Sequence, residues 1–234
     1  MSSKRLAIGT GLLALMTAYA AVGQELVSLD VGDAAGTPGS TAIDGDVYTI
    51  EGAGSDIWNA ADGFRFAYTE VSGDFEAVVH QISTDLPKEW SKGGVHVRQS
   101  IEAGAQNAQA IVTGGGASGA QLTWRPAADG ATDEFMDSAP GPWKDGECWI
   151  KLARSGDEFH GYISEDGVDW QDLLTTDVPM DDPVLVGIAV CGVSVMATGT
   201  YDGFTVVSGA RTLYPLDVDG RGKAAVTWGE MKAR

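Results

Sequence analysis

The chain has 234 residues, with 33 acidic and 15 basic side chains, and its net charge at pH 7 is −18. A protein this acidic repels phosphate groups, so nucleic acids and anionic membranes are poor partners for it. The acidic residues are scattered along the sequence rather than gathered in runs, which is typical of a solvated surface.

Residues 1–23 are predicted to be a secretory signal peptide. Lys4 and Arg5 form a positive start, and an apolar stretch covers residues 6–16. Ala18-Tyr19-Ala20 and Ala21-Val22-Gly23 each supply the small residues that a signal peptidase recognises, so cleavage falls after Ala20 or after Gly23. The apolar stretch is short for a helix that spans a bilayer, and a retained membrane anchor is the alternative. We therefore expect a periplasmic or secreted protein with no membrane insertion after cleavage.

From residue 26 onward, short stretches alternate between apolar and polar side chains. Gly, Asp, Ser and Pro bound each stretch, which is the signature of β-strands joined by tight turns. No long amphipathic helix pattern interrupts them. So many short strands predict an all-β protein, a two-sheet antiparallel sandwich or barrel. The clearest alternating stretches are Phe64–Tyr68, Phe75–Val79, Val95–Arg98, Gln121–Arg125 and Phe159–Ile163.

The strand pattern predicts one sandwich domain over residues 26–207. Residues 208–234 break the pattern and are predicted to be a C-terminal extension. Val226 and Trp228 in this extension have large apolar side chains that favour burial away from solvent. The extension therefore either packs back on the sandwich or docks on another exported protein.

Cys148 and Cys191 are the only cysteines, and export would permit a disulfide between them. Cys148 begins one apolar stretch and Cys191 ends another. If these two strands lie antiparallel and side by side, both sulfur atoms are at the same end of the pair. The sequence therefore predicts a Cys148–Cys191 disulfide, with two buried free thiols as the alternative.

A set of segments between residues 30 and 207 carries a family resemblance. These segments are Asp30–Thr41, Tyr48–Trp58, Ala61–Phe66, Ser72–Phe75, Trp90–Ser100, Gln121–Arg125, Ile150–Gly156 and Tyr162–Trp170. In order and spacing they resemble the DUF1349 group of concanavalin A-like lectin/glucanase domains. The resemblance implies a jelly-roll sandwich, an accessory module of an exported bacterial protein and an association with carbohydrate. His96 and Cys191 depart from the residues that the group often has.

The sequence contains no recognisable catalytic arrangement. A retaining glucanase often displays its carboxylates as Glu-x-Asp-x-x-Glu on one strand face, and this pattern is absent. His80, His96 and His160 stand singly, with no Gly-x-Ser-x-Gly motif. We therefore expect no enzymatic activity. A glycoside hydrolase with carboxylates from distant strands is the less favoured alternative.

No cofactor is predicted, although calcium is a candidate ion. Asp217-Val218-Asp219-Gly220 begins like a calcium-binding loop, but its glycine comes too early. Asp30 and Asp33 would meet Asp202 if the two chain ends lie together.

Aromatic and basic side chains give the best indication of a ligand site. Indole rings stack on sugar rings, while polar side chains bind the hydroxyl groups. Strand alternation places Arg98 on the same face as His96, and Arg125 on the face opposite Trp124. The predicted ligand site is Arg98, His96 and Arg125, with Trp58 or Trp90 at the rim and Trp124 as the substitute if its strand presents the other face. Alternatively, Trp149 and Trp170 are core residues and Trp58 anchors a loop.

These observations predict an exported, non-catalytic module that binds a polysaccharide or glycan in a groove on one sheet. The alternative is a surface or matrix domain that binds another exported protein.

Overall fold

The computed structural model describes residues 26–114, 119–137, 143, 146–209 and 211–214. The predicted signal peptide, the Asp217–Gly220 loop, Val226 and Trp228 lie outside these residues. Within the described part, no helix is long and apolar enough to cross a membrane.

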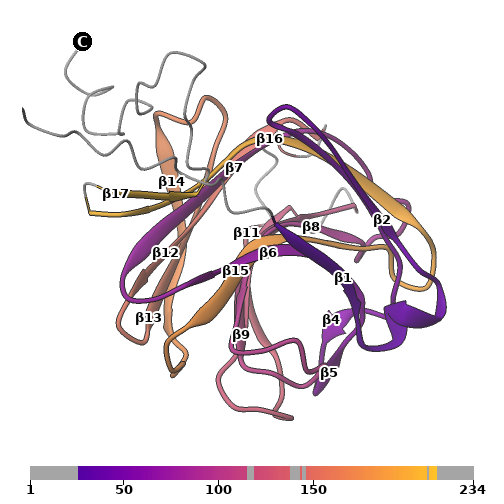
Figure 1. The fold of residues 1–234 in the computed structure, drawn as a ribbon, viewed down its shortest axis with the longest axis horizontal. Coiled ribbons are helices and arrows are strands. Elements are labelled where there is room, and N and C mark those ends of the chain that lie inside the picture. The colour runs from indigo at the N-terminus through magenta and orange to yellow at the C-terminus, as the bar shows by residue number, and fades with distance from the viewer. Residues whose placement is uncertain (1–25, 115–118, 138–142, 144–145, 210, 215–234) are drawn as a thin grey trace, which may run out of the picture.

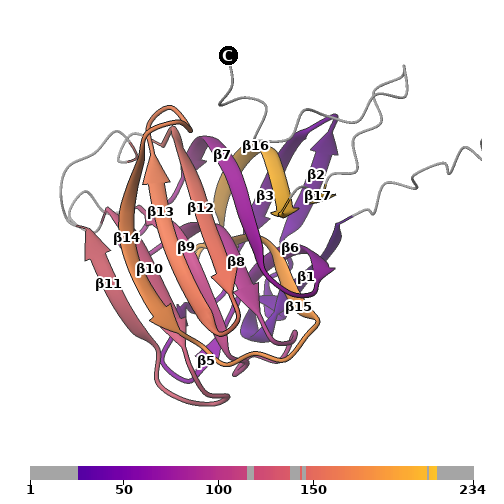
Figure 2. The ribbon, with the colours of Figure 1, turned by 90° about the vertical axis from the view of Figure 1, so that its left-hand side faces the viewer.

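The described residues form two antiparallel sheets that face each other (Figure 1). The 7-stranded sheet has the order β1 (Val27–Val31), β6 (Phe64–Val71), β15 (Val184–Cys191), β8 (Lys92–Arg98), β9 (Asn107–Thr113), β10 (Ala120–Arg125) and β11 (Asp133–Asp137). The 8-stranded sheet has the order β14 (Trp170–Asp177), β13 (Glu158–Ser164), β12 (Cys148–Ser155), β7 (Phe75–Asp85), β16 (Ala197–Ser208), β3 (Val47–Gly52) and β2 (Ser40–Asp44), and β17 (Arg211–Tyr214) also pairs with β16. Figure 2 shows β14, β13, β12 and β7 side by side in front of the other sheet.

Two small elements complete the fold. The 3₁₀ helix η1 covers Gly32–Gly36, and the hairpin of β4 (Ile57–Trp58) and β5 (Ala61–Asp62) forms its own two-stranded sheet. The predicted all-β antiparallel jelly-roll sandwich is therefore confirmed.

The core between the sheets follows from the predicted alternation. Val95 and Val97 of β8 point into the main apolar cluster, as does Leu122 of β10. His96 and Arg98 point to the other face of the sheet, yet they are also fully buried. The sequence predicted one buried side for each strand, whereas every residue of β8, β9 and β15 is buried.

A second apolar cluster accounts for the burial of β15. It lies on the outer face of the 7-stranded sheet, away from the 8-stranded sheet, and includes Ile57, Phe64, Phe66 and Cys191. Ile57 comes from hairpin β4–β5, which therefore covers part of the outer face. Figure 1 shows β4 and β5 below β6, on the side away from β7 and β16.

The predicted Cys148–Cys191 disulfide is wrong. β12, which carries Cys148, pairs with β7 and β13, whereas β15, which carries Cys191, pairs with β6 and β8. The two strands belong to different sheets, and both thiols are free and buried. The alternation of apolar and polar residues predicts which side chains share a face of a strand, but it does not predict which strands are neighbours.

Strand pairing continues past residue 207, where the sequence predicted the domain to end. β17 pairs with the end of β16, and Tyr214 is buried. The Tyr214 hydroxyl lies 3.0 Å from the Tyr48 hydroxyl of β3. Residues 211–214 are thus part of the sandwich.

Burial raises the pKa of the Cys148 and Cys191 thiols to about 12. Because thiolates are the reactive species, we expect both cysteines to resist a thiol reagent in the native protein. Denaturation without reductant should release 2 titratable thiols per chain. A denatured, unreduced protein without free thiols would contradict the structure.

Candidate functional site

Hairpin β4–β5 is attached to the 7-stranded sheet through a buried carboxylate. Its tight turn is made possible by Asn59, which has a φ of 53°, a conformation that asparagine tolerates better than most residues. Asp62 of β5 lies opposite Ile57 and is 2% exposed. The apolar side chain of Ile57 and the carboxylate of Asp62 therefore both fix this hairpin to the sheet.

Asp62 binds two arginines from the sheet. Its Oδ2 accepts hydrogen bonds from Arg98 Nη1 at 3.0 Å, Arg125 Nη1 at 2.8 Å and Asn107 Nδ2 at 3.2 Å. Its Oδ1 accepts a further bond from Arg125 Nη2. Arg98, Asn107 and Arg125 come from three neighbouring strands, β8, β9 and β10, and occupy facing positions of the sheet. The cluster thus ties the hairpin to three strands at once.

The two guanidinium groups carry one positive charge more than Asp62 neutralises. Main-chain carbonyl groups accept their remaining hydrogen bonds, which is the usual way to bury such a charge. The accepting residues are Ser100 and Glu102 for Arg98, and Asn59, Ala103 and Ala105 for Arg125. Both arginines therefore hold the covering loops and present no donor to solvent.

His96 belongs to the same buried group. Its ring contacts Phe64 and Phe66, with centroid distances of 4.9 and 5.4 Å. Its Nδ1 lies 3.1 Å from Gln109 Oε1, and Arg98 Nη1 donates to its Nε2 at 3.2 Å. Burial, followed by the charge of Arg98, lowers the pKa of His96 well below its ordinary value. The imidazole is therefore neutral.

The structure brings the predicted set Arg98, His96 and Arg125 together on one face, but it does not expose them. All three are fully buried beneath the hairpin and the loop that precedes β9. Trp124 points the other way and packs against the main core between the sheets.

The open part of this face lies farther along β8 and β10. It is a pocket of about 240 Å³ lined by Asp56, Trp58, Trp90, Lys92, Gln121 and Glu134. The sequence predicted Trp58 or Trp90 at the rim of the site of Arg98, His96 and Arg125, and both line this neighbouring pocket instead. Trp90 is 39% exposed and Trp58 is half-buried, so both indoles are accessible from solvent.

Lys92 connects two sides of the pocket. Its Nζ donates to Asp56 Oδ1 at 2.5 Å and to the Trp90 carbonyl oxygen at 3.0 Å. Its side chain is 3% exposed, whereas that of Asp56 is 30% exposed. The ammonium group is therefore engaged within the protein, and Asp56 is the accessible member of the pair.

Gln121 is the most informative residue of the pocket. Its side chain is fully buried, yet neither amide atom has a hydrogen-bond partner among the described residues. On the same strand, Thr123 Oγ1 also lacks a partner, as does Gln109 Nε2 opposite Thr123 on β9. Leaving such a group unpaired costs about 1–3 kcal/mol. Of these three residues only Gln121 lines the pocket, and an unsatisfied group there indicates a polar ligand or bound water.

Two other tryptophans lie on the outer face of the 8-stranded sheet, and not in the core as the alternative interpretation held. Trp149 stacks on His80 with a centroid distance of 4.6 Å. Trp170 lies beside Tyr162 and under the ammonium group of Lys151.

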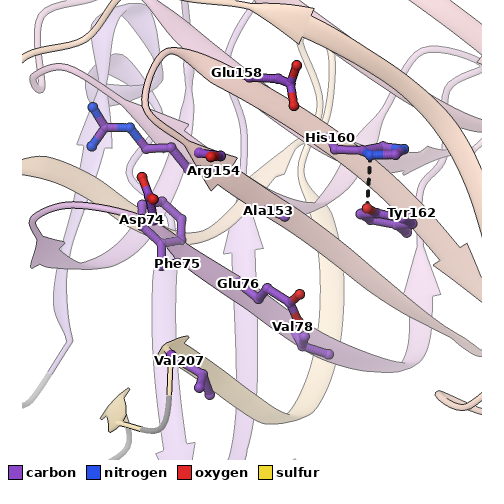
Figure 3. Close-up of a pocket in the computed structure, with 12 residues that line it drawn as sticks. Asp74, Phe75, Glu76, Val78, Ala153, Arg154, Glu158, His160, Tyr162 and Val207 are labelled. Carbon is purple, nitrogen blue, oxygen red and sulfur yellow. Dashed lines mark hydrogen bonds between the residues drawn. The ribbon is translucent and has the colours of Figure 1, made fainter.

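A larger cavity of about 440 Å³ opens on this outer face (Figure 3). Ala153 lies between Glu76 of β7 and His160 of β13, and its small side chain leaves a hollow. His160 is hydrogen-bonded to Tyr162, and the three nitrogen atoms of the Arg154 guanidinium donate to protein oxygens. None of the described residues that line this cavity has a buried polar atom without a partner. The smaller pocket is therefore the stronger candidate.

The acidic residues predicted to gather around calcium do not meet. Asp202 bonds His80 at 2.8 Å, Asp30 pairs with Arg65 at 3.2 Å, and Asp33 accepts from the Ser55 amide. Among the described residues, no three His, Cys, Asp or Glu side chains form a metal-binding group.

Sequence reasoning did not identify Asp56, Lys92, Gln121 and Glu134 as site residues. Alternation does place Gln121 and Thr123 on the face of Arg125, and that signal was available. Nothing local indicates that Asp56 meets Lys92, because the contact depends on how the hairpin folds over the sheet.

No protein-family model and no curated protein matches the sequence. The resemblance to the DUF1349 group therefore stays a prediction.

Several solved structures share the fold. A functionally unknown protein from Saccharomyces cerevisiae has a TM-score of 0.63 and 17% identity, over 79% of this chain and 97% of that chain. The carbohydrate-binding module CBM66 from Bacillus subtilis has a TM-score of 0.54 and 16% identity, also over 79% and 97%. A xylan β-1,4-xylosidase from Bacillus halodurans has a TM-score of 0.52 and 14% identity, over 72% of this chain but 38% of that chain. At these identities the similarity shows the jelly-roll fold alone.

The Asp62 cluster makes a prediction for stability. In Asp62→Asn, two buried guanidinium groups lose their counter-ion, so the free energy of unfolding should fall by about 3–5 kcal/mol. Urea denaturation would measure the change. The control Asp172→Asn removes a 73% exposed partner of His160, and its effect should stay within about 0.5 kcal/mol. A loss near that of the control would show that the cluster contributes little.

His96 makes a prediction for pH dependence. The unfolded chain binds a proton on this residue near its ordinary pKa, whereas the folded protein does not, so acidification favours unfolding. Between about pH 7.5 and 5.5, His96 should remove about 1.4 kcal/mol from the free energy of unfolding. The variant His96→Gln should lose this contribution and show a flatter stability profile in urea denaturation. Equal slopes for both proteins would refute a neutral, buried His96.

Proposed function

We propose that this protein is an exported, non-catalytic module that binds carbohydrate in the pocket between Trp58 and Trp90. The observation that carries the proposal is Gln121, a fully buried amide that lines the pocket and has no described protein partner for either polar atom. A sugar hydroxyl both donates and accepts hydrogen bonds, so a single sugar unit satisfies both ends of such an amide.

The aromatic residues of the pocket suit the apolar faces of a sugar ring. Trp58 comes from hairpin β4–β5 and Trp90 from the segment before β8, so the two indoles reach the pocket from different parts of the chain. An indole provides a large, flat contact surface with little conformational entropy to lose. Ligand pockets commonly combine such surfaces with a few polar groups that fix orientation.

The polar groups of the pocket are mainly acceptors. Asp56 and Glu134 contribute carboxylates, and Lys92 already donates to Asp56 and to a carbonyl group. Carboxylates accept charge-assisted hydrogen bonds from hydroxyl groups. A polyhydroxylated ligand supplies the donors that this set of acceptors requires.

The fold is compatible with this function. The solved structures of similar fold include the module CBM66 and a legume lectin-like domain from Entamoeba histolytica, the latter with a TM-score of 0.50 and 10% identity over 79% of this chain. Glycosidases with the same sandwich also exist, and two carboxylates share the pocket. Because Asp56 is bonded to Lys92, we assign both carboxylates to binding rather than to bond cleavage.

The variant Gln121→Leu should change the affinity for the ligand without lowering the free energy of unfolding. Leucine has a similar volume and removes an amide that is unsatisfied in the free protein, so the free energy of unfolding should stay constant or rise. Binding should weaken by about 1–3 kcal/mol, which corresponds to about 5- to 150-fold in Kd. A glycan array would first identify the ligand, and calorimetry would then compare the variants.

Trp90→Ala should also weaken binding, whereas Tyr162→Ala, which changes the outer cavity, should not. Loss of binding in Tyr162→Ala alone would place the site on the other sheet. Release of reducing sugar that is abolished by Glu134→Gln would show a hydrolase instead of a binding module.

A further inference from the structure

The charge of the pocket restricts which sugars fit. Asp56 and Glu134 are its two carboxylates, and Lys92 is its only ammonium group among the described lining residues. Lys92 is 3% exposed and hydrogen-bonded within the protein, so a ligand meets the carboxylates first. The chain as a whole carries a net charge of −18. The pocket therefore repels anionic sugars.

Glu134 is not neutralised by the described residues. It lies on β11 opposite Thr123, whose hydroxyl also lacks a partner, and it has no ion pair with a described residue. Asp56 Oδ1 accepts from Lys92 and from the Ile57 amide, and no hydrogen bond to Oδ2 is found in the described part of the chain. At least three carboxylate oxygens are thus available as acceptors.

The exposed indole of Trp90 and the half-buried indole of Trp58 line the same pocket as these carboxylates. A cation next to an indole face gains about 0.5–2 kcal/mol, and a charge-assisted hydrogen bond is roughly twice as strong as a neutral one. An ammonium group on a sugar ring would use both effects, while the ring itself would still stack on Trp58 or Trp90.

We propose that the pocket is selective for sugars with a free amino group, that is, for deacetylated amino sugars over their N-acetylated and hydroxyl counterparts. This inference rests on the proposed carbohydrate-binding function and adds its ligand class. An N-acetyl group removes the positive charge and introduces a carbonyl acceptor, which faces carboxylate acceptors unfavourably.

Three pentasaccharides with the same β-1,4 backbone test the proposal. They carry an ammonium, an N-acetyl or a hydroxyl group at carbon 2: the pentamers of glucosamine, N-acetylglucosamine and glucose. Calorimetry at mildly acidic pH should show the glucosamine pentamer binding at least about 10-fold more tightly than the other two. The preference should disappear as the pH is raised and the sugar amine loses its proton.

Matched variants distinguish the pocket from general attraction to an acidic protein. Glu134→Gln should reduce the preference for the amine to below about 3-fold while binding of the glucose pentamer persists. The control Glu70→Gln removes one exposed carboxylate that does not line the pocket, and it should leave the preference unchanged. Spermine, a polyamine without sugar rings, should not displace the pentamer.

The outcomes separate the two proposals. If all three pentamers bind equally and Gln121→Leu weakens each, the amine selectivity is wrong and carbohydrate binding stands. If the preference survives Glu134→Gln, or falls equally in Glu70→Gln, the selectivity does not arise in this pocket. If none of a broad set of glycans binds, or binding is unaffected by Gln121→Leu and Trp90→Ala, the proposed function itself fails.

Discussion

The ion cluster of Asp62 with Arg98 and Arg125 is the interaction on which the arrangement of the candidate site depends. The polar face of a β-sheet is normally left in contact with solvent. Here a carboxylate from a short hairpin reaches two guanidinium groups on β8 and β10, and loop carbonyls accept their remaining donors. Since burying charges is costly, such a cluster persists only if its charged groups are hydrogen-bonded. The hydrogen bonds of Asp62 require one position of the hairpin, and that position brings Asp56 and Trp58 to the pocket.

The outer face of the 7-stranded sheet therefore has two regions with opposite properties. Near Arg98 and Arg125, the guanidinium groups and the Asp62 carboxylate are hydrogen-bonded within the protein and solvent is excluded, although Asn107 Oδ1 has no partner among the described residues. Near Gln121, buried amide and hydroxyl groups are left without partners beside accessible indoles. The first region holds the loops in place, and the second region provides hydrogen-bonding capacity that a ligand can use. An unpartnered buried amide in its lining distinguishes the candidate pocket from the larger cavity on the other sheet.

Much of the fold and part of this site could be predicted from the sequence. Alternation and turn residues predicted the strands, and alternation also placed His96 with Arg98 and separated Arg125 from Trp124. The predicted ligand role of the arginines was based on their shared face, and the structure shows this face covered at their positions. The Cys148–Cys191 disulfide failed for a related reason. A period-two pattern shows which side of a strand is apolar, but it does not show which strands pair with it. The strands of Cys148 and Cys191 lie in different sheets.

The sequence by itself determined the all-β class and which side chains of a strand share a face, because these follow from local periodicity and turn geometry. It also supplied the tryptophans that border the pocket. Only the tertiary structure decided that hairpin β4–β5 covers Arg98 and Arg125, that Lys92 meets Asp56, and that Gln121 stays unpaired. The physical reason is that hydrogen-bond saturation and burial depend on contacts between segments far apart in the chain, and local sequence patterns do not encode which segments meet.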